Sequence, residues 1–458
     1  MNQRLEHLAH FPVGRLLWQY SLPAVVGMLV MSAYNIVDRI FIGHGIDATA
    51  IAGLTTTFPV MNIATALGVL VGAGASARIS IHLGAKQYDK AQSILGNALI
   101  MTLVIGVVYI SAFAIYLDDI LRLFGASKDS LPYAHDYMVA LLPGLLLTNL
   151  AFSFNNIQRA SGYPKRAMWT MIISAIVNIA LTPIFIFKFN MGIKGAAIAT
   201  DIAMAVAFIF VFRHFFNPRA NVHFSRSCFK TDFNVIGSIL AIGAAPALVN
   251  AAASMINALI NRSLYEYGAD NAVGAAGIFT TYTSVIVVVI IGVCQGMQPV
   301  LGYNYGAGLI HRLKRTYFLA TTVATALCIA GSIISLTCPG LIARCFTKDA
   351  ELISQTEFGL RTGTLAFVLV GFQIVTSNFF QSIGLAYQSI ILSLSRQVIF
   401  LIPLLWLLPA SFGITGVWIS FPISDILATL ITAGFIIHRL RLISIEAQTK
   451  SLITKIHE

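Results

Sequence analysis

Long apolar runs follow one another along almost the whole of this sequence. Six lie near residues 16–42, 50–83, 93–117, 132–160, 164–187 and 193–216, and six more near 235–262, 271–305, 314–338, 351–384, 386–409 and 414–438. Each is long enough for a helix to cross the ~30 Å of hydrocarbon in a bilayer. Only 10% of the residues are charged, against about a quarter in a soluble domain. The sequence therefore predicts an all-α membrane protein with about twelve transmembrane helices.

The basic residues indicate how the chain is threaded through the membrane. In a soluble protein, a formal net charge of +11 would suggest nucleic acid as a partner. Here most Lys and Arg residues fall in alternate loops, such as those with Lys86, Lys165 and Arg312. Because cytoplasmic loops carry such an excess, we expect both termini in the cytoplasm and no nucleic-acid partner.

The two halves of the chain resemble each other. A displacement of 224 residues superposes Gly53 on Gly277, Gly68 on Gly292, Gly72 on Gly296 and Gly84 on Gly308, and a displacement of 221 superposes Gly192-Ile-Lys-Gly195 on Gly413-Ile-Thr-Gly416. Chance agreement among many glycines is the alternative. Two copies of six spans enter the membrane in the same orientation, and such parallel repeats enclose a central cavity in transporters. The predicted organisation is an N-terminal lobe at 1–217, a cytoplasmic linker at 218–234, a C-terminal lobe at 235–440 and a cytoplasmic tail at 441–458.

Asp38 is an ionisable residue in the first predicted span, where a charge is costly. Apolar surroundings favour the uncharged form of a carboxyl group, so we interpret Asp38 as a group that exchanges protons. Asn35 and Tyr34, three and four residues earlier, lie on the same helical face and offer neutral ligands. The alternative is an interfacial aspartate that is solvated or paired with Arg39.

Two later spans of the first half carry polar residues at helical spacing. Asn178 and Thr182 are four residues apart, and Ala196 and Thr200 repeat this spacing directly before Asp201. Oxygen groups on one helical face suit a monovalent cation or a hydrogen-bonded proton. Ordinary hydrogen bonding between helices is the alternative.

The second half offers no comparable group, because Asp425 is the one acid deep within its spans. We therefore place the cation-coupling site in the first half. The candidates are Asp38, Asn178, Thr200, Thr182, Ala196, Asp201 and Asn35.

Aromatic and methionine side chains near Asp38 are candidates for a drug-binding wall. Apolar and aromatic surfaces hold lipophilic cations, and methionine adapts to varied shapes. Helix packing or lipid contact is the alternative for each residue. The candidates are Tyr34, Met28, Met31, Phe58, Met61, Phe152 and Phe154.

No catalytic motif is present in the sequence. It lacks Gly-x-Ser-x-Gly, His-Glu-x-x-His and a P-loop, so we expect neither an enzyme nor ATP hydrolysis. Its five cysteines form no Cys-x-x-Cys pair, which indicates neither a disulfide framework nor a zinc site. We expect no cofactor. Close helix packing explains the Gly72-x-Gly74 pair better than a nucleotide does.

Several motifs together point to one family of transporters. They are Asn35-Ile-Val-Asp38-Arg-Ile-Phe-Ile-Gly43, Arg159-Ala-Ser-Gly162, Val177-Asn178-Ile-Ala-Leu-Thr-Pro183, Gly195-Ala-Ala-Ile-Ala-Thr200 and Gln298-Pro-Val-Leu-Gly-Tyr-Asn-Tyr-Gly-Ala-Gly308. Over nearly its whole length the chain resembles the multidrug and toxic compound extrusion (MATE) family, and most of all its DinF-like and MepA-like bacterial branch.

This resemblance implies two six-helix lobes in a V-shaped arrangement, in the cytoplasmic (inner) membrane of a bacterium. The family's coupling residues fall on Asp38, Asn178, Ala196 and Thr200, and its span-four asparagine on Asn155 or Asn156. If sodium is the coupling ion, the resemblance implies Asp38, Asn178 and Thr200 as its ligands.

The chain departs from the branch at Thr182, where a second aspartate is usual. With one carboxylate fewer, a sodium ion would have to exchange its hydration shell largely for neutral oxygens, whereas a lone buried carboxyl group readily takes up a proton. We therefore favour protons, unless Asp201 faces the same cavity.

The sequence as a whole predicts an antiporter that exports amphipathic, often cationic drugs or toxins in exchange for protons or sodium ions. We expect no obligate protein partner. The alternatives are a lipid-linked oligosaccharide flippase of related fold, a channel, or a membrane-embedded enzyme, and the absence of a catalytic cluster counts against the last.

Overall fold

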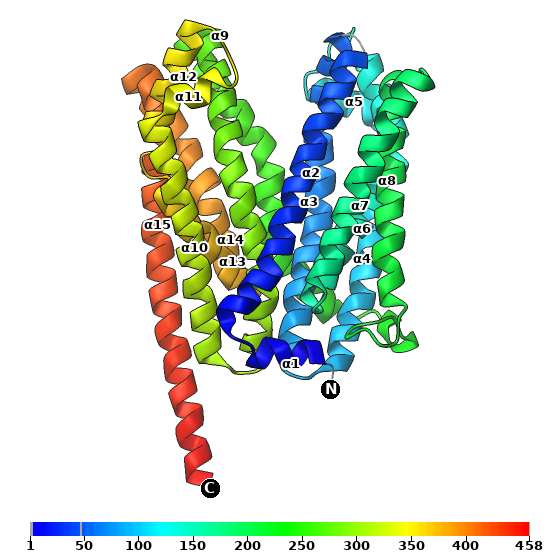
Figure 1. Ribbon diagram of the computed structural model, residues 1–458, viewed down its shortest axis with the longest axis vertical. Coiled ribbons are helices and arrows are strands. Elements are labelled where there is room, and N and C mark those ends of the chain that lie inside the picture. Colours follow the sequence, from blue (N-terminus) through cyan, green and yellow to red (C-terminus); the bar gives the residue numbers. More distant parts are fainter. Residues whose placement is uncertain (1–2, 46–47, 458) are drawn as a thin grey trace. The chain divides into compact units, whose positions relative to one another are not determined.

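The computed structural model describes the backbone of residues 3–45 and 48–457 and most side chains of these ranges, and this part of the chain contains helices and no strand. The helices of the first half are α1 (Gln3–His10), α2 (Val13–Gly45), α3 (Ala48–Gly84), α4 (Tyr88–Ile115), α5 (Leu117–Leu123), α6 (Leu131–Ala160), α7 (Pro164–Pro183), the π-helix η1 (Ile184–Lys188) and α8 (Gly192–Phe215) (Figure 1). Those that follow are η2 (Arg226–Phe229), α9 (Phe233–Gly306), α10 (Ile310–Thr337), α11 (Pro339–Arg344), α12 (Ala350–Gly363), α13 (Val368–Ser382), α14 (Ala386–Leu394), the π-helix η3 (Ser395–Leu401) and α15 (Ile402–His457).

The expected number of membrane spans is confirmed. Within the described ranges, ten helical segments are long and apolar enough to cross a membrane, and the pair α12 and α13, bent by 57°, makes an eleventh. The segment Ala386–Ile445 counts once but has 60 residues, far more than the ~20 that one crossing needs. Gly413 interrupts it with φ 56° and ψ −138°, a conformation that suits glycine. This segment therefore supplies two spans, which brings the total to twelve.

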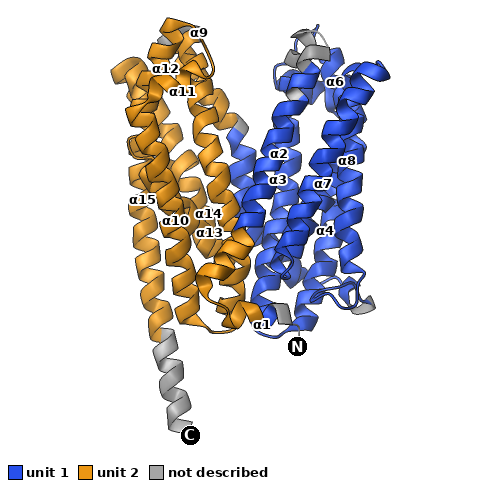
Figure 2. Ribbon diagram, in the orientation of Figure 1, with its two compact units in different colours: residues 1–6, 22–254 blue, residues 7–21, 255–458 orange. Residues whose placement is uncertain are grey.

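The chain forms two compact units (Figure 2). The first unit comprises Met1–Glu6 and Leu22–Ser254, and the second comprises His7–Ser21 and Met255–Glu458. The start of α2 thus belongs to the second unit, and the start of α9 belongs to the first.

The segment between the halves, residues 217–232, is fixed to the first unit. The side-chain amide of Asn97, on α4, donates to the carbonyl oxygen of Lys230 (3.1 Å) and accepts from the backbone N–H of Asp232 (3.0 Å). The ring of Phe224 lies 6.0 Å from that of Phe154, centroid to centroid. Because Asn97 is fully buried, this segment is a packed part of the first unit.

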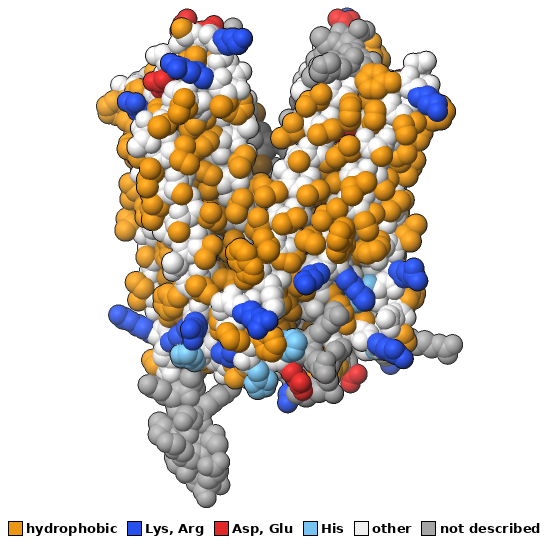
Figure 3. Space-filling model, in the orientation of Figure 1, with side chains coloured by type: hydrophobic (Ala, Val, Ile, Leu, Met, Phe, Trp, Pro, Cys, Tyr) orange, Lys and Arg blue, Asp and Glu red, His pale blue; other side chains and the backbone are white. Residues whose placement is uncertain are grey.

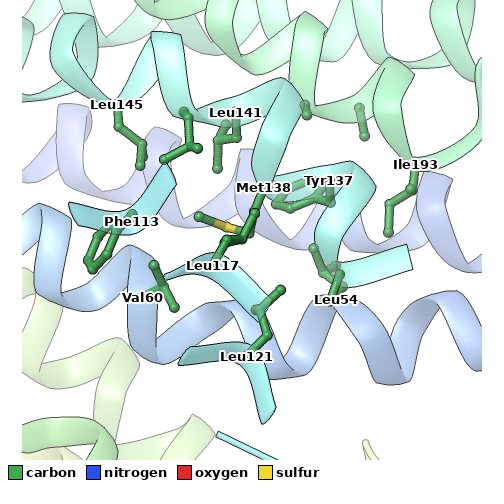
Figure 4. Close-up of a cluster of buried hydrophobic side chains, with 14 of the residues drawn as sticks. Leu54, Val60, Phe113, Leu117, Leu121, Tyr137, Met138, Leu141, Leu145 and Ile193 are labelled. Atoms are coloured by element: carbon green, nitrogen blue, oxygen red, sulfur yellow. The ribbon is translucent and has the colours of Figure 1, made fainter. Parts of the chain in front are cut away.

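Buried apolar side chains from several helices of the first unit form one cluster. Leu54 and Val60 of α3 face Tyr137, Met138 and Leu141 of α6, and Ile193 of α8 lies against the same cluster (Figure 4). On the surface shown in Figure 3, a wide hydrophobic band separates the ends of the helices, and Lys and Arg side chains gather at the end where α1 lies. This band is the surface expected of helices in lipid.

The predicted close helix packing at Gly72 and Gly74 is confirmed. A Cβ atom on Gly72 would lie 2.8 Å from the Cα atom of Ser153 in α6, and one on Gly74 would lie 2.0 Å from the carbonyl oxygen of Ile239 in α9. These glycines let backbones approach more closely than any side chain would allow.

Candidate functional site

Asp38 is joined to two other helices of the first unit by a chain of hydrogen bonds. The hydroxyl of Thr182, on α7, lies 3.1 Å from Oδ1 of Asp38, on α2, and 3.5 Å from Oδ1 of Asn178. The amide of Asn178 donates to Oγ1 of Thr200, on α8, at 3.1 Å. The hydroxyl of Thr200 donates to the carbonyl oxygen of Ala196 (3.1 Å). Asp38, Thr182, Asn178, Thr200 and Ala196 are thus brought together, and we call them the Asp38 group.

The direction of these hydrogen bonds depends on the charge of Asp38. Thr182 has one hydroxyl proton and two acceptor positions, so it donates either to Asp38 or to Asn178. An ionised Asp38 takes this proton, since hydrogen bonds to a charged acceptor are the stronger ones. A protonated Asp38 either offers Thr182 a neutral and therefore weaker acceptor oxygen or donates its own proton to the Thr182 hydroxyl. One proton on Asp38 therefore weakens or reverses the hydrogen bond between α2 and α7.

Two tyrosines lie close to this group. Tyr34 is buried one turn before Asp38 on α2. Tyr137 of α6 is 3% exposed and belongs to the same buried cluster as Ala196.

Asp201 faces α6, whereas its neighbour Thr200 faces α7. A Cβ atom built on Gly144 of α6 would lie 1.7 Å from Oδ1 of Asp201, so the carboxyl group rests against the backbone of that glycine. Oδ1 is buried and has no hydrogen-bond partner among the described residues. Asp201 is thus not part of the hydrogen-bond chain from Asp38 to Ala196, although it lies one residue from it.

We expect Gly144→Ala to lower the thermal stability of the detergent-solubilised protein, by about 1–3 kcal/mol as in other overpacked sites. The reason is that the new methyl group takes the place of the Asp201 carboxyl group. The matched control is Gly106→Ala, whose methyl group would meet only the flexible end of Leu146. In the double variant Gly144→Ala/Asp201→Ser the loss should largely disappear. If the double variant unfolds at the temperature of Gly144→Ala, this carboxyl group is not the obstacle.

A small cavity lies in the first unit, between α2, α6, α7 and α8. Its walls are mostly apolar, with three methionines and one phenylalanine, and its polar side chains are uncharged. It is lined by Met31, Ala151, Phe152, Asn155, Thr170, Met171, Ser174, Met204 and Ala207. Of the candidates for substrate contact, Met31, Phe152 and Asn155 thus line this cavity. Asn155 is held in place by bonds to Arg159 (2.9 Å) and to the carbonyl oxygen of Ala167 (2.8 Å).

Other candidates lie elsewhere in the first unit. Phe154 is fully buried among aromatic rings that include Phe212 and Phe215. Asn156 donates to Phe152 of its own helix, and exposed Asn35 donates to Met31 of its own helix. Phe58 and Met61 pack against the cluster in Figure 4. The side chain of Arg39, the alternative partner of Asp38, lies outside the described residues.

The Asp38 group contains one carboxylate, one amide and two hydroxyl groups. Within the described part of the chain, no three His, Cys, Asp or Glu side chains gather in a way that could hold a metal.

Sequence reasoning missed Tyr137, Gly144 and six of the nine cavity residues, among them Met171, Ser174 and Met204. Met171 and Ser174 are one turn apart, and Ser174 and Asn178 are another turn apart on the same helix. This spacing was a usable signal. Tyr137 and Gly144 gave none, because their neighbours come from helices distant in sequence.

Comparison with known families supports the repeat and the fold. A family model described as MatE matches the chain twice, at residues 23–184 and 246–407, with an offset of 223 residues between the two matches. The multidrug export protein MepA of Staphylococcus aureus is 27% identical over 442 residues, which cover 96% of this chain and 97% of MepA.

Two solved structures illustrate the structural likeness. The MATE multidrug transporter DinF-BH, solved as a complex, is 37% identical with a TM-score of 0.86, covering 93% of this chain and 95% of that one. A MATE transporter in a bent conformation has a TM-score of 0.91 at 25% identity, covering 97% of this chain and 99% of that one.

Proposed function

Since the chain belongs to the MatE family, we propose that it exports amphipathic, often cationic compounds in exchange for protons, by alternating access. MepA is a multidrug export protein by name, and the likeness covers nearly all of both chains. The observation that carries the proposal is the Asp38 group, a series of hydrogen bonds that starts at one carboxyl group on α2 and continues through α7 to α8. Such a carboxyl group gives a cation a means to alter helix packing.

Asp38 is the exchange group in this proposal. Taking up a proton removes its charge and weakens or reverses its hydrogen bond with Thr182, which changes how strongly α2 is held to α7. Alternating access requires two packings of the helices in this unit, and protonation of Asp38 changes the difference in free energy between them. The proton gradient across the membrane then favours one packing over the other. The hydrogen bond between Asn178 and Thr200 fixes the end of this series of hydrogen bonds that lies away from Asp38.

The cavity beside Met31 is the proposed binding site for the apolar part of the exported compound. Methionines suit varied shapes, and their sulfur atoms contact aromatic rings favourably. Drug-sized ligands occupy pockets of about 300–1,000 Å³, so this small cavity has to widen as the helices move. Asn155 supplies the fixed polar contact.

We place the protein in the inner membrane of a bacterium, with both termini in the cytoplasm. The support is the gathering of Lys and Arg side chains at the end of the helices where α1 lies (Figure 3), which follows the excess of basic residues in cytoplasmic loops. In this proposal the protein acts without a cofactor, an obligate protein partner or nucleic acid, and it is not an enzyme.

Drug efflux from proteoliposomes tests the function and the coupling ion together. A fluorescent cation such as ethidium is loaded, and either a pH gradient or a sodium gradient is imposed with the membrane potential clamped. We expect efflux that depends on the pH gradient, with reciprocal proton movement when a drug gradient is imposed instead.

Robust efflux under a sodium gradient at equal pH would overturn the proton assignment. Drug flux that never moves protons or sodium in return would indicate a channel. Headgroup exchange of a lipid-linked oligosaccharide, without drug efflux, would favour the flippase.

Restoring a second acid at position 182 should change the response to sodium. We expect Thr182→Asp to make efflux sodium-dependent, because a second carboxylate beside Asn178 adds the charged oxygen ligand that a hard cation prefers. The control is Thr182→Ser, which keeps the hydroxyl group that donates to Asp38 and should retain proton coupling. A Thr182→Asp variant that transports with an unchanged sodium response would count against an ion site here.

A further inference from the structure

Basic side chains gather in the second unit where α10 begins and α15 approaches its end. The amine of Lys314, in α10, donates to the hydroxyl of Ser444, in α15, so the two helices are in contact here. Residues 271–348 contain no acidic residue, and none lies between Asp425 and Glu446. We call the following five residues the α10–α15 basic cluster: Arg312, Lys314, Arg315, Arg439 and Arg441.

The described part of the chain does not neutralise the charge of this cluster. The guanidinium group of Arg312 donates to the carbonyl oxygens of Leu8 (3.1 Å) and Phe11 (2.6 Å), and the partner of Lys314 is a hydroxyl group. Arg315 and Arg441 are exposed, and neither forms an ion pair with a described residue. Two charges are therefore fixed by neutral oxygens, and two more are free to meet a partner.

The position of the cluster next to a cytoplasmic loop does not by itself explain its charge. The displacement of 224 residues that superposes Gly84 on Gly308 also superposes residues 87–91 on residues 311–315. Residues 87–91 contain one acid and one base, Asp89 and Lys90, whereas residues 311–315 contain three bases and no acid. Parallel repeats place both stretches on the same side of the membrane. Since the first repeat is neutral here, orientation in the membrane requires no such charge.

Exposed apolar side chains lie one helical turn from the two free arginines. Phe318 follows Arg315 by three residues and is 55% exposed, and Ile437 precedes Arg441 by four residues and is 52% exposed. Residues at these spacings share a helical face. In both helices the apolar residue lies farther from the end of the span than the arginine, on the side of the hydrophobic band (Figure 3). The surface thus offers charge at the membrane boundary and apolar contact just inside it.

We propose that the α10–α15 basic cluster binds the headgroup phosphate of an anionic phospholipid, with the acyl chains against Phe318 and Ile437. A guanidinium group can hold phosphate oxygens through two parallel hydrogen bonds, and basic residues near a membrane surface attract anionic lipids. A phosphate held by Arg315 and Arg441 links α10 to α15. This site lies outside the Asp38 group and the cavity beside Met31, which belong to the first unit.

Native mass spectrometry of the purified protein tests this site. Phosphatidylglycerol and phosphatidylcholine with identical acyl chains are offered at equal concentration. We expect the wild type to retain phosphatidylglycerol in preference. In Arg315→Gln/Arg441→Gln, which keeps most of the side-chain volume, the affinity for phosphatidylglycerol should fall roughly tenfold because two attractive charges are lost. The affinity for phosphatidylcholine should not change.

The matched control is Lys90→Gln/Lys165→Gln, which removes two exposed charges from the first unit. This variant should bind phosphatidylglycerol as the wild type does. An equal loss in both double variants would show a general effect of net charge and overturn the proposal, as would no loss in either. Inorganic phosphate at millimolar concentration should not displace the lipid, and displacement would identify a site for small anions instead.

Both arginines are exposed, so the double variant should fold. If its yield is nevertheless too low, the single variants Arg315→Gln and Arg441→Gln give the same comparison. Lipid binding is measured in detergent without transport, so its failure would leave the proposed export function untouched. Conversely, a protein without drug efflux could still show the preference for phosphatidylglycerol.

Discussion

Asp38→Asn should reduce efflux driven by a pH gradient to the level of protein-free liposomes. The amide has nearly the shape of the carboxyl group but cannot gain or lose a proton near neutral pH. Thr182 would still find a neutral acceptor in the amide oxygen, as it can in protonated Asp38, so the variant should fold but stay in the state of the protonated acid. The expected defect is therefore in coupling. Unfolding temperature and yield from membranes should stay near those of the wild type.

The matched control is Asn35→Ala on the same helix. Asn35 is exposed, and the one hydrogen bond of its side chain to the described residues goes to the carbonyl oxygen of Met31, one turn earlier. Its removal should change efflux little. If Asp38→Asn transports normally at normal expression, Asp38 is not the exchange group, and attention would pass to Asp201.

Membrane spans could be predicted well because the length and polarity of each run decide whether a helix can cross a bilayer. The run at 50–83 corresponds to α3 (Ala48–Gly84), and the run at 164–187 to α7 with η1. The 57° bend between α12 and α13 was not foreseen in the run at 351–384. That run contains no proline, but α12 ends at Gly363, next to the bend, and glycine is a local signal for a kink that the sequence reading did not use.

The sequence also did not predict that the two ends of α2 belong to different compact units. Apolar periodicity tells which residues are helical, but it does not tell which neighbouring helix they pack against. The start of α2 contacts the second unit through Ser21, which meets Gly296 of α9. The one hint in the sequence was that a glycine occurs at the same position of both repeats, as Gly72 and as Gly296, which suggests close helix packing at each.

The candidate site was predictable in part, for a physical reason. Residues four apart lie on one helical face, so Asn178 and Thr182 could be paired from their spacing. That Asp38 and Thr200 meet them follows from contacts between helices, and here the family resemblance supplied what spacing did not. The substrate residues were harder to identify, since apolar side chains facing a cavity and those facing lipid have the same chemistry.

Gly243→Ala should be severely destabilising. A Cβ atom on Gly243 of α9 would lie 1.7 Å from the carbonyl oxygen of Leu70 in α3 and 2.6 Å from its carbon. These are backbone atoms within a helix, so no side-chain rotation relieves the clash, and the two helices must move apart. Overpacking typically costs about 1–3 kcal/mol where side chains can adjust, and we expect a larger loss here. Lower yield from membranes and a lower unfolding temperature in detergent would measure it.

Gly237→Ala provides the control in the same helix. Apart from its chain neighbours and the nearby backbone of its own helix, no described atom lies within 4 Å of the Cβ position at Gly237, and alanine is the better helix former by up to about 1 kcal/mol. This variant should match or exceed the wild type in stability. Together with the segment held by Asn97, the contact at Gly243 makes the start of α9 part of the first unit. If Gly243→Ala proved as stable as Gly237→Ala, α9 and α3 would not pack this closely, and the start of α9 would be free to move separately from the first unit.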